Sequence, residues 1–316
     1  MLEVDRLCVT FDTPDGAVPA VAEVSFRLER GECLGIVGES GAGKSQSLLA
    51  LMGLLPSQAK ISGTARFNGE SLLDPRDSRA AALRGRQMAM IFQDPMTSLT
   101  PHMTVGEQIG ESLRRHLGLN RSAARERTLA LLRQVQVTDV ERRWAQYPHE
   151  LSGGMRQRVM IAMALACDPP LLIADEPTTA LDVTIQAQIL SVLVALKRER
   201  GMALALITHD LGVIAGVADR VLVMYGGRVV ETGSVREVLG TPRHPYTRAL
   251  LDSMPRLDAT GQGPLQAIAG QPPNPRRLPS GCAFHPRCRH SSEHCRSVRP
   301  ESRDGVACHH PLTVST

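Results

Sequence analysis

Short apolar runs and longer amphipathic stretches alternate along the chain up to about residue 240. Residues 3–11 and 18–28 have the composition of strands, and the turn-rich segment Thr13-Pro14-Asp15-Gly16 joins them. Five further runs are short and almost wholly apolar, which is typical of buried strands. They lie at residues 33–37, 88–92, 171–175, 203–208 and 221–225.

Apolar positions at helical spacing fill much of the sequence between these runs. They predict helices at residues 45–52 and 184–200, and residues 104–166 are rich in helical patterns, as at 122–135. Strands that alternate with helices predict an α/β fold, in which helices cover a largely parallel sheet. The helix-rich stretch between two strands predicts a separate subdomain at about residues 96–166.

The last part of the chain differs in composition. From about residue 241 onwards Pro, Gly and Arg dominate, which predicts a loop-rich extension over residues 241–316 and not a second α/β domain. The net charge of the chain is +4, and residues 273–316, with seven arginines and three acidic residues, account for the excess. This charge suits a surface for a protein partner or for lipid headgroups, and it equally suits a solvated tail.

Composition also excludes several classes of protein. Aromatic residues make up 3% of the chain, which argues against a surface that stacks on bases, so no nucleic-acid partner is expected. The longest apolar run, residues 159–167, has nine residues, far fewer than the roughly 20 that a membrane-spanning helix needs. The first residues lack the basic-then-apolar pattern of a signal peptide. We therefore expect a cytosolic chain that reaches a membrane only through a partner.

The segment Gly38-Glu39-Ser40-Gly41-Ala42-Gly43-Lys44-Ser45 fits the phosphate-binding P-loop pattern G-x-x-x-x-G-K-[ST]. Its glycines let backbone N–H groups turn towards phosphate oxygens, and the helix that follows directs its positive end towards the same anion. Lys44 can reach the β- and γ-phosphates, and the Ser45 hydroxyl can bind Mg²⁺. The alternative is a Gly-rich turn, which the predicted flanking strand and helix disfavour.

A pair of carboxylates, Asp175 and Glu176, lies at the end of the apolar run at residues 171–175. At the end of a buried strand, Asp175 can hold Mg²⁺ and Glu176 can orient or deprotonate an attacking water, as phosphoryl transfer requires. Taken alone, Asp-Glu-Pro is as typical of a turn or a helix start. The P-loop earlier in the chain favours the catalytic interpretation.

Between these motifs lies Leu151-Ser152-Gly153-Gly154-Met155, followed by Gln157 and Arg158. A P-loop, then LSGGMRQR, then LLIADE resembles the ATP-binding-cassette (ABC) ATPases, and the resemblance covers about residues 1–310. It implies a P-loop ABC ATPase core over residues 1–240, with N-terminal antiparallel strands and a helical subdomain, followed by the extension at 241–316. Such a core binds ATP with Mg²⁺ and hydrolyses the nucleotide.

The resemblance implies roles for further residues. Gln93, after a buried strand, resembles the Q-loop glutamine that contacts Mg²⁺ and water, and His209 resembles the switch histidine that contacts the γ-phosphate. Asp182, in Ala180-Leu181-Asp182, resembles the D-loop aspartate that couples two facing sites. Phe11 is the candidate for the aromatic that stacks on adenine, and a phenylalanine of the core or an edge strand is the alternative. The implied catalytic set is Lys44, Gln93, Glu176 and His209.

The segment Ser152, Gly153 and Gly154 begins a predicted helix, whose first N–H groups suit an anion. The family resemblance implies that two cassettes face each other head to tail, so that these residues cover the ATP on the P-loop of the partner. A second cassette, identical or paralogous, is therefore an expected partner. An isolated monomer is expected to have little activity.

Four cysteines, Cys282, Cys288, Cys295 and Cys308, lie close together in the extension with the spacing C-x5-C-x6-C-x12-C. Four thiolates suit a tetrahedral site for a soft metal. Zinc is the generic alternative although C-x2-C pairs are missing, and the five histidines of this region allow mixed ligation. Four free thiols are the remaining interpretation.

Two segments of the extension resemble a smaller group within the ABC ATPases. They are His244-Pro245-Tyr246-Thr247-Arg248-Ala249-Leu250 and Leu278-Pro279-Ser280-Gly281-Cys282. They are similar to the C-terminal region of the ATP-binding subunits of oligopeptide and dipeptide importers. This resemblance implies a 4Fe-4S cluster on the four cysteines. It also implies a peripheral position on the cytoplasmic face of the inner membrane, with two permease subunits and, indirectly, a peptide-binding protein.

Two alternative functions stay open on sequence grounds. An importer for nickel or another small solute would use the same ATPase motifs, because the residues that select the solute are expected in other subunits. A soluble ABC ATPase of DNA repair or translation belongs to another class. Such proteins usually have two cassettes in one chain, a long coiled coil or nucleic-acid insertions, and this sequence has none of them.

Overall fold

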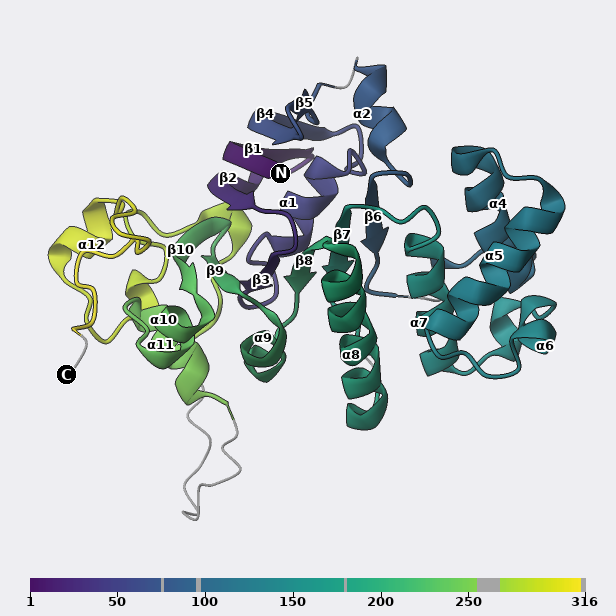
Figure 1. The fold of residues 1–316 in the computed structure, drawn as a ribbon. Coiled ribbons are helices and arrows are strands. Elements are labelled where there is room, and N and C mark those ends of the chain that lie inside the picture. The colour runs from purple at the N-terminus through teal and green to yellow at the C-terminus, as the bar shows by residue number, and fades with distance from the viewer. Residues whose placement is uncertain (75–76, 95–97, 179–180, 255–267, 314–316) are drawn as a thin grey trace, which may run out of the picture. The chain divides into compact units, whose positions relative to one another are not determined.

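The computed structural model describes residues 1–74, 77–94, 98–178, 181–254 and 268–313. Contacts divide the chain into two compact units, each containing strands and helices (Figure 1). The first unit is formed by Met1–Arg27, Leu34–Leu73 and Thr208–Thr316, and the second by Leu28–Cys33 and Asp74–Ile207.

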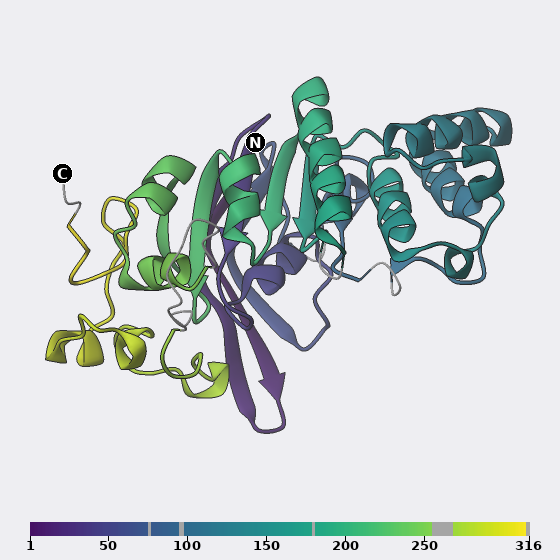
Figure 2. The ribbon, with the colours of Figure 1, turned by 90° about the horizontal axis from the view of Figure 1, so that it is seen from below.

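An antiparallel sheet opens the first unit. Its strand order is β2-β1-β4-β5, with β1 at Leu2–Thr13, β2 at Gly16–Leu28, β4 at Ala59–Phe67 and β5 at Glu70–Ser71. The first two strands form the long hairpin that is visible in Figure 2. Strand β1 pairs with β4 so that Leu2 lies opposite Phe67 and Phe11 opposite Ala59. This sheet agrees with the predicted antiparallel strands at the N-terminus.

A second group of strands in the first unit supports the P-loop. Strand β3 (Cys33–Val37) is buried along its whole length and pairs in parallel with β9 (Arg220–Tyr225), which pairs antiparallel with β10 (Arg228–Ser234). A run that is buried on both faces is apolar at every position, as the sequence pattern indicated. Helices α1 (Lys44–Leu51), α9 (Leu211–Val217) and α10 (Val235–Gly240) belong to the same unit.

The extension is short of regular structure, as predicted. Among its described residues are the helices α11 (Pro245–Asp252) and α12 (Glu293–Ser297) and two short 3₁₀ turns, Pro275–Arg277 and His285–Arg287. Its last part lies along β10, where the N–H of Thr232 donates to the Gly305 carbonyl and the N–H of Ala307 donates to the Val230 carbonyl. The extension is therefore attached to the sheet that carries the P-loop.

The second unit contains three parallel strands, with β7 (Leu171–Asp175) between β6 (Met88–Ile91) and β8 (Ala203–Ile207). Its helices are α2 (Ser78–Leu83), α4 (Val105–Leu117), α5 (Arg121–Gln134), α6 (Val140–Trp144), α7 (Gly153–Ala164) and α8 (Val183–Arg200). Local signals set their ends: Thr104 and Glu107 form a capping box at the start of α4, and Gly118 ends it in the left-handed conformation. Within the parts of the chain that the structure describes, no helix is both long enough and apolar enough to span a membrane.

Candidate nucleotide-binding site

The P-loop connects β3 to α1 and depends on glycine at two positions. Gly38 has φ 149° and Gly43 has φ 92°, both in the region that favours glycine. A Cβ at Gly38 would lie 2.2 Å from the Met224 carbonyl oxygen, and one at Gly43 would lie 2.5 Å from that of Ala20. A side chain at either position would clash with a neighbouring backbone carbonyl, so both positions require glycine.

Lys44 begins α1 with its side chain folded back into the loop. Its ammonium donates hydrogen bonds to the carbonyl oxygens of Gly38, at 2.8 Å, and Glu39, at 3.0 Å, and the residue is only 7% exposed. Ser45 follows in the first turn and is half-buried. A cation and the N-terminal amides of a helix thus occupy one place, and both attract phosphate oxygens.

Two more predicted site residues belong to the first unit. His209 is exposed and follows Thr208, whose N–H donates to the Ile36 carbonyl in β3, and Asp210 caps α9 through the N–H groups of its first turn. The histidine therefore lies just beyond a segment that is bonded to the strand before the P-loop. Phe11 in β1 is half-buried, so it does not belong to the buried core.

In the second unit, the end of β7 brings two predicted residues together. Asp175 is the last residue of the strand and is 6% exposed. Glu176 has φ 46°, and its N–H donates to the Ile207 carbonyl at 3.0 Å. Its carboxylate accepts a hydrogen bond of 3.1 Å from the amide nitrogen of Gln93, which is 83 positions away in the sequence. A positive φ at a residue other than glycine costs about 1–3 kcal/mol and is typical of functional sites.

The signature segment lies at the start of the twelve-residue helix α7. Ser152 is the N-cap, and its hydroxyl accepts from the N–H of Met155 at 3.4 Å. Ser152 and Gly153 are exposed, whereas a Cβ at Gly154 would lie 3.0 Å from a side-chain carbon of Ile185 in α8. At the start of α7, Ser152 and Gly153 are therefore accessible to a ligand, whereas Gly154 packs against α8.

Gln157 and Arg158, which follow the signature, are buried and have structural contacts. The Gln157 amide donates to the Pro177 carbonyl, just after the Asp175–Glu176 pair. The Arg158 guanidinium donates to the Val135 carbonyl at 2.8 Å and to the Gln188 side chain at 2.7 Å. These residues connect α7 to the end of β7 and to α5 and α8.

Asp182 caps helix α8, because its carboxylate accepts from the N–H of Ile185 at 2.9 Å. The aspartate itself is exposed, and Val183 beside it is 83% exposed. Ala180 of the same predicted D-loop lies outside the described residues. The cap gives Asp182 a local structural role that its sequence motif did not indicate.

The four cysteines of the extension line one small cavity: Cys282, Cys288, Cys295 and Cys308. Burial raises the thiol pKa of Cys282, Cys288 and Cys308, the last to about 11, and the nearby cysteines raise all three further. In the portions that the structure describes, no three His, Cys, Asp or Glu side chains are placed to hold a single metal ion. Histidines 244, 285, 290, 309 and 310 line the same cavity.

Two residues of the extension contact the P-loop although their sequence motifs predict no such role. The Tyr246 hydroxyl accepts a hydrogen bond from the N–H of Glu39 at 2.9 Å, and Arg287 forms an ion pair with the Glu39 carboxylate at 2.6 Å. Tyr246 belongs to the segment 244–250, which resembles the C-terminal region of peptide-importer ATPases, but that resemblance predicts no contact with the P-loop. Nothing in the local sequence marks Arg287.

Comparisons with known sequences agree with these motifs. The family described as ABC transporter matches residues 21–179, and the one described as Oligopeptide/dipeptide transporter, C-terminal region, matches residues 230–295. The oligopeptide transport ATP-binding protein OppD of Salmonella typhimurium is 55% identical over 300 residues, which are 95% of this chain and 89% of that protein. The dipeptide transport ATP-binding protein DppD of Escherichia coli is 48% identical over 318 residues, 99% of this chain and 97% of that protein.

Solved structures confirm the predicted fold. The dimeric structure of MJ0796, described as a bacterial ABC transporter cassette, matches with a TM-score of 0.68 and 28% identity over 75% of this chain and 99% of that chain. A post-hydrolysis state of the same cassette, bound to ADP and Pi, matches equally well. The chain therefore belongs to the ABC transporter family, as an ATP-hydrolysing member.

Proposed function

We propose that the chain is the ATP-hydrolysing subunit that powers the uptake of dipeptides or oligopeptides across the inner membrane. The observation that carries this proposal is the extent of the likeness, which continues past the ATPase core. Relatives named for oligopeptide and dipeptide transport align with 95% and 99% of the chain, and the peptide-transporter C-terminal region matches residues 230–295.

We assign the phosphates of MgATP to the P-loop, residues 38–45. When MgATP binds, the Lys44 ammonium would give up a hydrogen bond to a loop carbonyl and bind oxygens of the β- and γ-phosphates. Ser45 and Asp175 would hold Mg²⁺. Glu176 orients or deprotonates the attacking water. The buried position of Asp175 and the hydrogen bond from Gln93 to Glu176 support these roles.

Further contacts complete the proposed site. With nucleotide bound, Gln93 would contact Mg²⁺ and water in place of its hydrogen bond to Glu176, and His209 would contact the γ-phosphate. Phe11 stacks on adenine, for which its half-buried position in β1 is suitable. These roles come from the family resemblance and are compatible with the exposure of Gln93 and His209.

Two cassettes are proposed to act together, head to tail. The exposed residues Ser152 and Gly153 at the N-terminus of α7 cover the ATP of the partner, and Asp182 at the start of α8 couples the two sites. MgATP binds more tightly to the closed pair than to the open one, which is how a ligand drives a conformational cycle. The exposed Val183 beside Asp182 suits burial in such an interface.

Two membrane permeases are the proposed site of attachment, so the chain lies at the cytoplasmic face of the inner membrane. The helical subdomain, at about residues 96–166, passes the closing movement to them. A peptide-binding protein delivers the solute from the other side.

We propose that the four cysteines of the extension hold a 4Fe-4S cluster. They line a single small cavity, so all four are close together. The absorbance at about 400 nm of anaerobically purified protein tests this assignment. A colourless protein that contains zinc would reject it.

Reconstitution tests the proposed transport function. The chain is co-expressed with candidate permease subunits of a peptide importer, and the complex is placed in vesicles that contain ATP. Uptake of a labelled tripeptide with peptide-stimulated ATP hydrolysis supports the proposal. Stimulation by Ni²⁺ and not by peptides, or co-purification with ribosomes or DNA and not with permeases, contradicts it.

A further inference from the structure

The start of α11 places one tyrosine hydroxyl against the P-loop. His244 caps the helix, since its Nδ1 accepts from the N–H of Tyr246 at 3.0 Å, and Pro245 occupies the first helical position. Burial lowers the pKa of His244 to about 4, so the imidazole is neutral at pH 7 and can accept this bond. The resulting turn buries Tyr246 completely and brings its hydroxyl to the N–H of Glu39 at 2.9 Å.

The peptide group between Gly38 and Glu39 is consequently held at both ends. Its N–H donates to the Tyr246 hydroxyl, and its carbonyl accepts from the Lys44 ammonium at 2.8 Å. Gly38 has φ 149° and no side chain, so nothing of its own restricts rotation at this point. The orientation of this peptide group sets the position of the Gly38 carbonyl, which accepts the hydrogen bond from Lys44. The hydrogen bond to the Tyr246 hydroxyl fixes that orientation.

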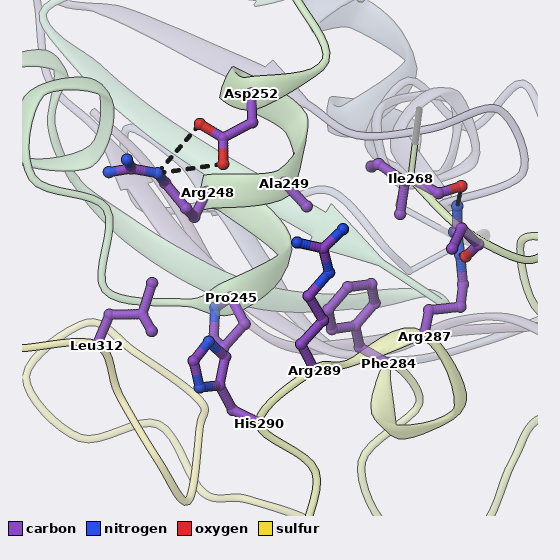
Figure 3. Close-up of a pocket in the computed structure, with 11 residues that line it drawn as sticks. Pro245, Arg248, Ala249, Asp252, Ile268, Phe284, Arg287, Arg289, His290 and Leu312 are labelled. Atoms are coloured by element: carbon purple, nitrogen blue, oxygen red, sulfur yellow. Dashed lines mark hydrogen bonds and ion pairs between the residues drawn. The ribbon is translucent and has the colours of Figure 1, made fainter. Parts of the chain in front are cut away.

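Arg287 holds the same residue by its side chain. Its guanidinium donates to both carboxylate oxygens of Glu39, at 2.6 and 3.1 Å, and to the Tyr225 hydroxyl at 3.3 Å. It also donates to the backbone carbonyls of Ile268 and Ala269, and Figure 3 shows it directed towards Ile268. The side chain is only 5% exposed, so water competes weakly for these bonds.

An aromatic cluster keeps both contacts in place. The rings of Tyr225 and Tyr246 have centroids 4.5 Å apart, and Phe284 lies 5.2 Å from the first and 5.3 Å from the second. Phe284 itself lies three positions before Arg287. In a chain with few aromatic residues, this cluster packs α11 and β9 against the segment that contains Phe284 and Arg287.

We propose that Tyr246 and Arg287 are positioning residues for the nucleotide: the C-terminal extension holds Glu39 and thereby preorganises the P-loop for phosphate. A loop that is fixed before the ligand arrives loses less conformational entropy on binding. This inference rests on ATP binding at the P-loop and is independent of which solute is transported.

Conservative substitutions in the full chain test the inference. Tyr246→Phe removes the hydroxyl and keeps the ring, and Arg287→Lys keeps the charge and loses the paired bonds. We expect the Kd for MgADP, measured by titration calorimetry, to rise about threefold to tenfold in each, as for the loss of one or two hydrogen bonds. The control Arg276→Lys alters an exposed ion pair between the extension and Asp15 and leaves the Kd unchanged.

Two further measurements separate positioning from a general loss of structure. Hydrogen exchange without nucleotide is expected to accelerate at residues 38–43 in Tyr246→Phe and to stay unchanged in α10. In a Glu39→Gln background, Arg287→Lys is expected to change the Kd by less than about twofold, because the ion pair is already lost.

Wild-type Kd values in both variants, with normal MgADP binding by the unmodified chain, would overturn the inference and leave the ATPase assignment intact. An undiminished effect of Arg287→Lys in the Glu39→Gln background would overturn it as well. A wild-type chain that fails to bind MgADP would instead refute the nucleotide site itself. A lack of peptide stimulation in vesicles would affect only the proposed transport function.

Discussion

Substitution Arg287→Ala removes a side chain that makes five hydrogen bonds within the described part of the chain. It leaves the Glu39 carboxylate, which is 23% exposed, without its bidentate partner, and it leaves the Ile268 and Ala269 carbonyls without a donor. Breaking a buried ion pair by removing one partner costs about 3–5 kcal/mol. Since Glu39 retains some contact with water, we expect the lower end, about 3 kcal/mol of unfolding free energy.

The matched control is Arg276→Ala in the same extension. Its ion pair with Asp15 has a similar length, 2.7 Å, but the two side chains are 51% and 68% exposed. Such a pair contributes about 0–1 kcal/mol. The two arginines therefore differ in burial and in the number of bonds that they make, and the comparison separates a buried, multiply bonded arginine from an exposed single ion pair.

Three measurements test this difference: urea unfolding, hydrogen exchange in α11 and residues 268–313, and thermal melting. Arg287→Ala is expected to lower the urea midpoint and to accelerate amide exchange throughout this region. Its melting temperature is expected to fall by roughly 5–10 °C. Arg276→Ala is expected to resemble the unmodified chain. Equal stability of the two variants, within about 0.5 kcal/mol, would refute the claim that Arg287 holds the extension to the P-loop.

Three further predictions concern the core. Gly38→Ala is expected to abolish MgADP binding in a calorimetric titration, because its Cβ would lie 2.2 Å from the Met224 carbonyl oxygen. The control Gly31→Ala, also at positive φ but in open space, is expected to lose only about 1 kcal/mol of stability and to bind MgADP normally. Equal MgADP binding by the two variants would show that the clash at Gly38 does not matter. Arg158→Ala removes the donor to the buried Val135 carbonyl and to the side chain of the exposed Gln188, and it should lower the unfolding free energy by about 2–3 kcal/mol in urea, whereas a loss under 1 kcal/mol would argue against this role. Gln93→Ala should slow ATP hydrolysis by the assembled complex about tenfold or more while the Kd for MgADP stays unchanged, and a normal rate would remove Gln93 from the site.

Buried strands were predictable because their apolar runs are local signals. Strand β7 occupies the predicted residues 171–175, and β3 occupies 33–37. Strand β10 was missed although Gly226-Gly227, both at positive φ, is a typical hairpin turn after an apolar run. Strand β4 gave no such signal, since only Ala65 and Phe67 of its nine residues are buried.

The P-loop was predictable from the sequence because one short segment holds its glycines, lysine and serine. The contact between Glu39 and Arg287 was not, since the two residues are 248 positions apart and only tertiary packing brings them together. The sequence motif also assigned Glu39 to phosphate binding, whereas its carboxylate pairs with the extension. A motif predicts which backbone surrounds the phosphate, but it does not predict what holds that backbone.

The central claim is that Glu176 belongs to an ATP-hydrolysing site, and substitution Glu176→Gln in the assembled transporter tests it most directly. The amide keeps the shape of the carboxylate and can no longer accept a proton from water. Hydrolysis is expected to fall by about a hundredfold or more, while ATP still drives closure of the two cassettes, detected by cross-linking between them. Normal turnover by the Glu176→Gln complex would contradict the account.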